Sequence, residues 1–223
     1  MRAILFGGTG MVGQGVLREC LLDDRVEHVL SVGRTPLDTR HDKLSELVRP
    51  DLFDLSEAGT VADQLAGYDA CFFCLGVSSA GLAEAEYRRL TYDLTLSAAG
   101  AVAAASPGLT FIYVSGQGTD STEAGRIRWA RVKGATENAL RALPMRNFAF
   151  RPGFIQPLHG ITSKTPVYAL AYRVSGPLLP VLRRLAPNAV TTTEVIGRAM
   201  IAVAEHGYPT PVLETRDLNA AAK

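Results

Sequence analysis

Three glycines near the start of the chain have the spacing of a phosphate-binding turn. Gly7, Gly10 and Gly13 follow the pattern G-x-x-G-x-x-G, directly after the apolar segment Arg2–Phe6 and before the helix-like run Met11–Leu22. In such a turn the first glycine permits a tight bend, the second lets the main chain approach phosphates, and the third lets the helix pack on the strand. Strand, turn and helix together predict a dinucleotide fingerprint.

The chemistry expected of this turn is the binding of a negatively charged diphosphate. The main-chain N–H groups of Thr9, Met11 and Val12 are expected to point at the diphosphate. The dipole of the following helix favours negative charge at its N-terminus. The alternative is an ordinary glycine turn without a ligand. We predict that these three residues and the three glycines bind the cofactor.

The residues after the second predicted strand indicate which nucleotide is preferred. An NAD-binding fold usually carries Asp or Glu here, about 20 residues past the turn, to bind the ribose hydroxyls. This chain has Gly33 and Arg34 instead. A guanidinium can hold a 2′-phosphate that a carboxylate would repel, so NADP(H) is favoured over NAD(H). Arg40 or Lys43 could add to this site, and the alternative is that Arg34 is a solvated loop residue.

Two later segments are expected to contact the rest of the cofactor. Asp54 follows the third predicted strand, where a carboxylate can accept a hydrogen bond from the adenine amino group, and Asp51 is its competitor. After the fourth predicted strand, Leu75 and Gly76 begin a run of residues that would leave room for the cofactor to pass.

The rest of the chain must supply the framework that positions these residues. Strand candidates alternate with helix candidates, which predicts a parallel sheet covered by helices on both faces, with ligands at the carboxyl ends of the strands. The predicted class is α/β, a Rossmann-type doubly wound parallel sheet. The strands are Arg2–Phe6, His28–Val32, Leu44–Val48, Ala70–Leu75, Thr110–Ser115 and Asn147–Arg151, and the helices are Met11–Leu22, Ser56–Leu65, Leu82–Ala105 and Ile127–Leu143.

The pattern changes after Pro152, where prolines interrupt short amphipathic pieces. We expect residues 153–190 to form a small C-terminal cap on the substrate side, within a single NAD(P)-binding Rossmann domain of residues 1–223. Within this cap, Tyr168–Leu185 mixes leucines with arginines. We interpret it as the apolar lining of the substrate pocket rather than as a membrane-surface segment.

The C-terminal region contains one further helix signal. Thr191–Glu194 resembles a capping box that opens a helix over Val195–His206. The last residues, Leu218–Lys223, are expected to be frayed.

Composition and charge exclude several classes of protein. The chain has 223 residues and a formal net charge of +1 without a polybasic run, which argues against nucleic acid as a main partner. The N-terminus does not read as a signal peptide, and no apolar run is long enough to span a bilayer. Three cysteines suit a reducing compartment, so we predict a cytoplasmic protein.

Two of the cysteines have the C-x-x-C spacing of a redox pair. Cys71 and Cys74 lie inside a strand candidate, where residues three apart point to opposite faces, so we predict plain core cysteines. No second Cys or His pair has the spacing of metal ligands, and we predict no metal site.

Several short motifs occur in the order and spacing of a known family. They are Gly7–Gly13, Gly33-Arg34, Asp54-Leu55, Cys74-Leu-Gly76, Val114-Ser115, Lys133-Gly134 and Arg151-Pro-Gly153. Together they resemble the atypical short-chain dehydrogenases, in particular the Tat-interacting-protein-like NADP-binding proteins and the bacterial proteins labelled NAD-dependent epimerase/dehydratase. The resemblance covers residues 1–160.

The resemblance implies a set of catalytic residues. In that family a serine after the fifth strand polarises the substrate carbonyl, a tyrosine transfers the proton, and a lysine four positions later holds the nicotinamide ribose. Ser115 matches the serine and Lys133 the lysine, but Trp129 stands at the tyrosine position. An indole N–H is not a usable general acid or base, so Trp129 is expected to shape the pocket. The resemblance also implies that Pro152 and Gly153 contact the nicotinamide end.

Hydride transfer then needs another proton donor. Water, Ser115 or a tyrosine from elsewhere are the open choices, except that Tyr113 is expected to lie deep in its strand. His159 is either a general acid near the substrate or an inert loop histidine. The remaining tyrosines that stay open are Tyr87, Tyr92, Tyr168 and Tyr172.

Two functions from different classes follow from these residues. The first is an NADP(H)-dependent oxidoreductase or epimerase that acts on a small carbonyl or alcohol. The second is a non-catalytic NADP(H)-binding redox sensor or regulatory protein, which needs no proton donor. A small-molecule substrate is the expected partner of the enzyme, and homo-oligomerisation is left open.

Overall fold

The computed structural model describes residues 1–55, 61–162 and 188–223. Seven strands, all paired in parallel, form a sheet in the order β3-β2-β1-β4-β5-β6-β9. This is the strand order of a doubly wound Rossmann sheet with one strand added, so the predicted fold class is confirmed. The strands are β1 Arg2–Phe6, β2 His28–Gly33, β3 Leu44–Val48, β4 Ala70–Phe73, β5 Thr110–Val114, β6 Arg146–Arg151 and β9 Val212–Glu214.

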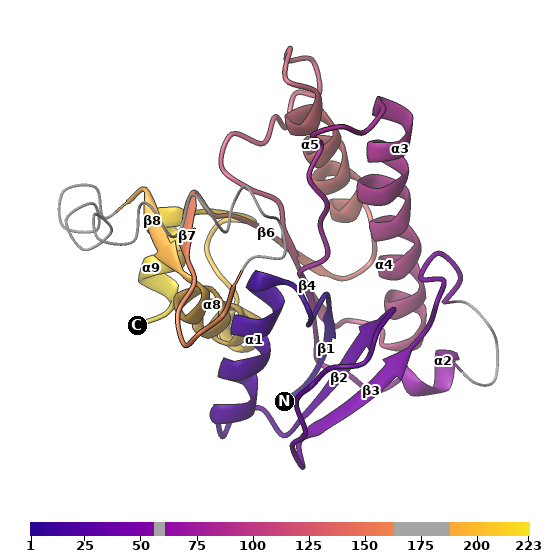
Figure 1. Cartoon of the computed structure of the whole chain (residues 1–223), viewed down its shortest axis with the longest axis vertical. Helices are drawn as coiled ribbons and strands as arrows, with labels where there is room; N and C mark the ends of the chain where they lie inside the picture. The colour runs from indigo at the N-terminus through magenta and orange to yellow at the C-terminus, as the bar shows by residue number, and fades with distance from the viewer. Residues whose placement is uncertain (56–60, 163–187) are drawn as a thin grey trace.

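Helices cover both faces of this sheet (Figure 1). One face carries α1 (Met11–Leu22), α8 (Thr193–His206) and α9 (Thr215–Ala221). The other face carries α2 (Val61–Gln64), α4 (Leu94–Ala105) and α5 (Arg128–Arg141), with α3 (Glu84–Arg88) and the π-helical turn η1 (Arg89–Asp93) leading into α4.

Side chains of the central strands alternate between two buried clusters, one on each face of the sheet. In β1, Ala3 and Leu5 belong to the cluster under α1 and α8, whereas Ile4 and Phe6 belong to the cluster under α4. All four are fully buried. A strand covered on both faces has no polar side to show, which is why these segments read as apolar runs.

The C-terminal part of the chain contains strands and a helix that the sequence did not indicate. Strand β9 extends the sheet beside β6, and β7 (Phe154–Gln156) pairs in parallel with β8 (Val190–Thr192) in a separate small sheet. The expectation of a frayed C-terminus is wrong. Helix α9 has a capping box between Glu214 and Asp217, and its Leu218 is fully buried in the core.

Helix α8 begins two residues earlier than predicted. The hydroxyl of Thr192 caps it by accepting a hydrogen bond from the main-chain N–H of Val195. Most of the proposed cap, residues 163–187, lies outside the described residues. The interpretation of residues 168–185 as a pocket lining therefore concerns residues that the structure does not describe. The single-domain organisation and the cap stay predictions.

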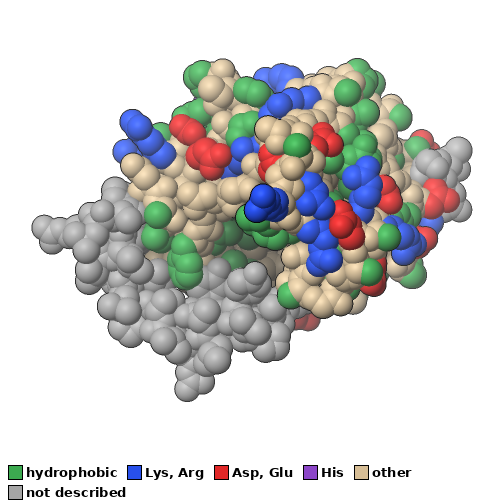
Figure 2. Space-filling view, turned by 90° about the horizontal axis from the view of Figure 1, so that it is seen from above, with side chains coloured by type: hydrophobic (Ala, Val, Ile, Leu, Met, Phe, Trp, Pro, Cys, Tyr) green, Lys and Arg blue, Asp and Glu red, His purple; other side chains and the backbone are tan. Residues whose placement is uncertain are grey.

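The surface shows no large patch of one charge in the view of Figure 2, where Lys and Arg side chains are interspersed with Asp and Glu. Among the described residues, no helix combines the length and the apolar character needed to cross a membrane.

Candidate functional site

A cleft of about 980 Å³ lies at the carboxyl ends of the central strands. It contains the loops that follow β1 and β4, the neighbouring strands at which the strand order reverses, and this is where open α/β sheets bind ligands. Its lining residues are Gly7, Gly8, Thr9, Gly10, Met11, Val12, Ser31, Gly33, Arg34, Thr35, Pro50, Leu52, Cys74, Leu75, Gly76, Val77, Ser78, Val114, Ser115, Gly116, Lys133, Pro152, Gly153 and Ile155. Of the predicted cofactor residues, only Gly13 and Asp54 are absent from this lining.

The glycine turn has a backbone geometry that requires glycine at two of its positions. Gly7 has a φ of +84°, and a Cβ atom there would lie 2.8 Å from the carbonyl carbon of Cys74. Gly13 is buried under the turn, where a Cβ atom would overlap the carbonyl group of Gly7. Gly13 therefore acts from beneath, by allowing helix α1 to approach the strand.

The start of helix α1 is open to an anion. Within the described part of the chain no side chain caps Gly10, the N-cap residue, and the first turn contains no acidic residue. The first N–H groups of a helix have no partner inside the helix, and they carry the positive end of its dipole. These observations fit the diphosphate of a dinucleotide.

The loop after β2 forms the next part of the cleft. Arg34 is exposed and lines the cleft together with Ser31 and Thr35. The two other basic residues considered for this position do not line it: Arg40 pairs with Glu46, and the Lys43 amine donates to the main-chain carbonyl of Asp23 at the C-terminal end of α1.

At the predicted adenine position the structure places apolar residues instead of a carboxylate. Pro50 and Leu52 line the cleft, whereas Asp54 is exposed and does not. Asp51 is engaged locally, because its Oδ1 accepts a hydrogen bond from the N–H of Phe53 at 2.8 Å. Pro50 and Leu52 were missed because apolar loop residues carry no chemical signal.

Ser115 and Lys133 meet at the other end of the cleft. Lys133 lies on α5, and its Nζ donates a hydrogen bond to the main-chain carbonyl of Ser115, which directly follows β5. Burial lowers the pKa of Lys133 to about 8, although the nearby Glu137 carboxylate works in the opposite direction. The amine is therefore easier to deprotonate than an exposed lysine.

Trp129 lies in the wall of a side pocket of about 390 Å³ that shares Ser115, Lys133 and Gly153 with the main cleft. Tyr87 of α3 lines the same side pocket. Tyr113 lines neither space; it is packed in the core beside Phe73, and burial raises its pKa. Tyr168 and Tyr172 lie outside the described residues.

Sequence reasoning missed a buried carboxylate directly behind the serine. Glu137 is 2% exposed, and its Oε1 accepts a hydrogen bond from Ser115 Oγ at 2.6 Å. Arg151 binds both carboxylate oxygens, with Nε at 3.0 Å from Oε1. This hydrogen-bonded pair raises the pKa of Arg151. A signal was present, since Glu137 follows Lys133 by one helical turn and Arg151 stands in the last matched motif.

The two cysteines of the C-x-x-C segment point to opposite faces of the sheet, as expected. Cys71 is fully buried in the cluster under α4, whereas Cys74 packs against the other cluster and borders the cleft. Burial raises the pKa of both thiols. Cys74 differs from the prediction of a core residue because β4 ends at Phe73, one residue before it.

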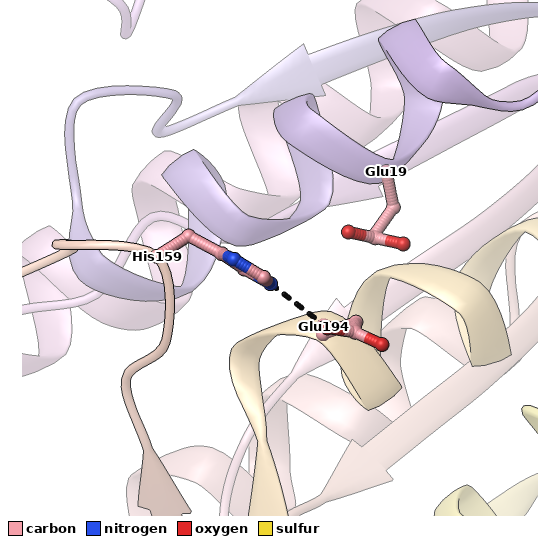
Figure 3. A group of neighbouring side chains, drawn as sticks. All are labelled: Glu19, His159 and Glu194. Atoms are coloured by element: carbon pink, nitrogen blue, oxygen red, sulfur yellow. Dashed lines mark hydrogen bonds and ion pairs between the residues drawn. The ribbon is translucent and has the colours of Figure 1, made fainter.

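His159 belongs to a separate cluster that joins α1 to α8 (Figure 3). Its Nε2 lies 2.8 Å from Glu194 Oε2, close to the buried Glu19. Arg198 binds both carboxylates, at 3.1 Å to Glu19 and 2.8 Å to Glu194, and Arg18 also pairs with Glu19. The hydrogen bond from His159 lowers the pKa of Glu194. His159 does not line the cleft.

Comparison with known proteins gives two distant curated relatives and many structures of the same fold. No family model matches the chain. Protein FMP52, mitochondrial, of Debaryomyces hansenii is 28% identical over 79% of this chain and 83% of its own length. FMP52-2, mitochondrial, of Scheffersomyces stipitis is 28% identical over 69% of this chain and 66% of its own length.

The similar solved structures include a short chain dehydrogenase family protein and proteins in complex with NADPH or NAD+. Gre2 of Candida albicans, in complex with NADPH, has a TM-score of 0.71 at 14% identity, covering 96% of this chain and 78% of Gre2. A short chain dehydrogenase family protein of Francisella tularensis has a TM-score of 0.63 at 14% identity, over 96% and 95%. WbmF of Bordetella bronchiseptica, in complex with NAD+, has a TM-score of 0.64 at 14% identity, over 98% and 76%. At these identities the comparisons show the shared Rossmann fold.

The relatives correct one expectation. Both curated relatives are named as mitochondrial proteins, so the prediction of a cytoplasmic protein is wrong. That prediction rested on unpaired cysteines, which indicate a reducing environment and do not distinguish one reducing compartment from another.

Proposed function

We propose that this chain binds NADP(H) in the cleft and transfers hydride between it and a small alcohol or carbonyl compound. In this proposal it is an atypical short-chain dehydrogenase/reductase of oxidoreductase or epimerase type, from the Tat-interacting-protein-like branch. The observation that carries the proposal is a single cleft that joins the glycine turn and Arg34 at one end to Ser115 and Lys133 at the other. A phosphate site or a polar pair alone would not specify a redox enzyme.

Each part of the dinucleotide has matching residues along this cleft. The N–H groups at the start of α1 suit the diphosphate, and the Arg34 guanidinium suits a 2′-phosphate. In this proposal Lys133 holds the nicotinamide ribose, and Pro152 and Gly153, which line the same cleft, contact the nicotinamide end. The bound nicotinamide supplies the hydride chemistry, and the protein supplies binding, orientation and proton transfer.

The chain contains an intrinsic fluorophore with which nucleotide binding can be tested. Trp129 is its only tryptophan and lines the side pocket at the nicotinamide end. Reduced nicotinamide absorbs tryptophan emission, so titration with NADPH should quench the Trp129 fluorescence saturably. NADH should bind more weakly. Absence of quenching and of calorimetric heat with both nucleotides would contradict the proposal.

A non-catalytic NADP(H) sensor is the second candidate, and Trp129 is the observation that favours it. Trp129 stands at the sequence position where the family carries its proton-transferring tyrosine and lines the side pocket, and an indole cannot perform that step. A panel of carbonyls with NADPH and of alcohols with NADP+ separates the two functions. The panel is run on the wild type, Trp129→Tyr and Trp129→Phe. Tight binding without turnover in all three would favour the sensor, and turnover by the wild type would favour the enzyme.

A further inference from the structure

The Ser115 hydroxyl has its proton directed away from the cleft. Two acceptors lie within reach of Ser115 Oγ: Glu137 Oε1 at 2.6 Å and the main-chain carbonyl of Phe150 at 3.2 Å. A hydroxyl has one proton to donate, and the shorter, charge-assisted bond to the carboxylate is the stronger of the two. The oxygen lone pairs of Ser115 are then left for the cleft. In this state the serine accepts a hydrogen bond from a ligand and cannot polarise a carbonyl.

The carboxylate behind this hydroxyl is held rigidly in place. The Glu137 side chain has no exposed surface, and Arg151 grips both of its oxygens. Arg151 also pairs with Glu214, at 3.6 Å, on the outer side of the network. Because Glu137 is closed off from solvent, the Ser115 hydroxyl joins it to the cleft, in which Lys133 also lies.

We propose that Ser115 and Glu137 form a proton relay that replaces the missing tyrosine, and that the substrate is a small alcohol. The inference rests on the proposed function. The alcohol O–H gives its proton to Ser115 Oγ while Ser115 gives its own proton to Glu137 Oε1. The carbinol C–H bond breaks, and its hydrogen leaves with the bonding electron pair as the hydride that reduces the oxidised nicotinamide. The products are a carbonyl compound, the reduced nucleotide and a protonated Glu137, which returns its proton to water through Ser115 after product release.

In this scheme Ser115 is the catalytic residue and Glu137 acts through it. A ligand that donates a hydrogen bond completes the arrangement, whereas a carbonyl oxygen would meet the lone pairs of Ser115. Lys133 does not compete for the carboxylate, since its hydrogen bond goes to the main-chain carbonyl of Ser115.

The test uses the full chain with NADP+ and the alcohol panel, and compares four single variants and the Ser115→Ala/Glu137→Gln double variant. Ser115→Ala removes the relaying hydroxyl and leaves the Glu137–Arg151 pair intact, so it tests the relay even where a Glu137 variant fails to fold. Glu137→Gln keeps an acceptor for the serine but cannot take up its proton. Glu137→Asp keeps the carboxylate. Glu214→Gln is the matched control, because Glu214 is half exposed and its carboxylate pairs with the same Arg151.

We expect kcat to fall about 100-fold in Ser115→Ala and in Glu137→Gln, the range of general acid–base catalysis. The quenching of Trp129 by nucleotide should change less than threefold in both variants. The double variant should be no slower than the slower single variant, because both changes break one relay. Glu137→Asp, which keeps the carboxylate, should recover part of the rate.

Three results would overturn the relay: kcat of Glu137→Gln within threefold of the wild type, an equal loss in Glu214→Gln, or nucleotide binding by the wild type without turnover of any alcohol. Reduction of carbonyls alone would leave the proposed function standing and remove the relay. A wild type that binds neither nucleotide would remove both.

Discussion

The side-chain amine of Lys133 donates a hydrogen bond to the main-chain carbonyl of Ser115, and this contact ties helix α5 to the end of strand β5. The lysine thereby reaches the cleft from a largely buried stem, and burial lowers its pKa to about 8. The contact explains how residues 18 positions apart form one end of a binding site.

The depressed pKa of Lys133 predicts a defined dependence of stability on pH. Between pH 8 and 10.5 the unfolded lysine holds a proton that the folded one has lost, so the lysine's contribution to stability rises with pH. The raised pKa values of the buried thiols act in the opposite direction and lower the stability as pH rises. The unfolding free energy of the wild type must therefore be compared with that of Lys133→Met at each pH, so that the contribution of the thiols cancels. Between pH 8 and pH 9.5, the unfolding free energy of the wild type, measured with urea, should rise by about 1.5 kcal/mol relative to that of Lys133→Met. A difference between the two proteins that does not change with pH would contradict this.

Arg34 predicts the nucleotide preference. It is exposed at the cleft wall, so removing it costs little stability, but a 2′-phosphate would lose a charge-assisted partner. Arg34→Ala should weaken NADPH binding about 10- to 100-fold and NADH binding less than twofold, measured by Trp129 quenching. Arg40→Ala in the same loop, whose guanidinium pairs with Glu46, is the control and should bind both as the wild type does. An equal loss for both nucleotides would refute the role.

Gly13 predicts a steric limit beneath the turn. A methyl group there would overlap the Gly7 carbonyl, so Gly13→Ala must displace α1 from the strand. We expect a loss of at least about 2 kcal/mol of unfolding free energy and a clear loss of nucleotide affinity. Gly100→Ala in α4 is the matched change, because nothing lies within 4 Å of its added methyl, and it should stabilise the protein by about 0.5–1 kcal/mol. Similar stability of the two variants would show that the turn adapts.

Arg198 predicts a structural role for the cluster between α1 and α8. Its guanidinium binds Glu194 and the buried Glu19, so Arg198→Ala leaves Glu19 with Arg18 as its remaining cationic partner. Unfolding free energy should fall by about 1–3 kcal/mol, whereas NADPH affinity should not change. Arg126→Ala, at an exposed arginine, serves as the reference and should be neutral. Loss of nucleotide binding in Arg198→Ala at unchanged stability would instead link this cluster to the cleft.

Local patterns in the chain were enough to predict the sheet and the phosphate turn. Six of the seven described strands of the sheet were identified, and the clearest were β1, β4 and β5, which are largely apolar runs because both of their faces are buried. The turn itself was readable because Gly7 and Gly13 are required by backbone geometry within a few residues of one another. Strand β9 escaped detection because three residues are too few to form a pattern.

The chemistry at the far end of the cleft depended on tertiary structure. Ser115 and Lys133 could be matched to a family, but the direction of the serine hydroxyl could not, because its partner Glu137 is 22 positions away and Arg151 a further 14. Whether such groups meet depends on the register of β5 with β6 and on how α5 packs above them. Asp54 shows the same limit, since its distance along the chain suited the adenine but it is not among the residues that line the cleft. A sequence fixes what each segment prefers locally, whereas contacts between segments follow from packing, which no single segment encodes.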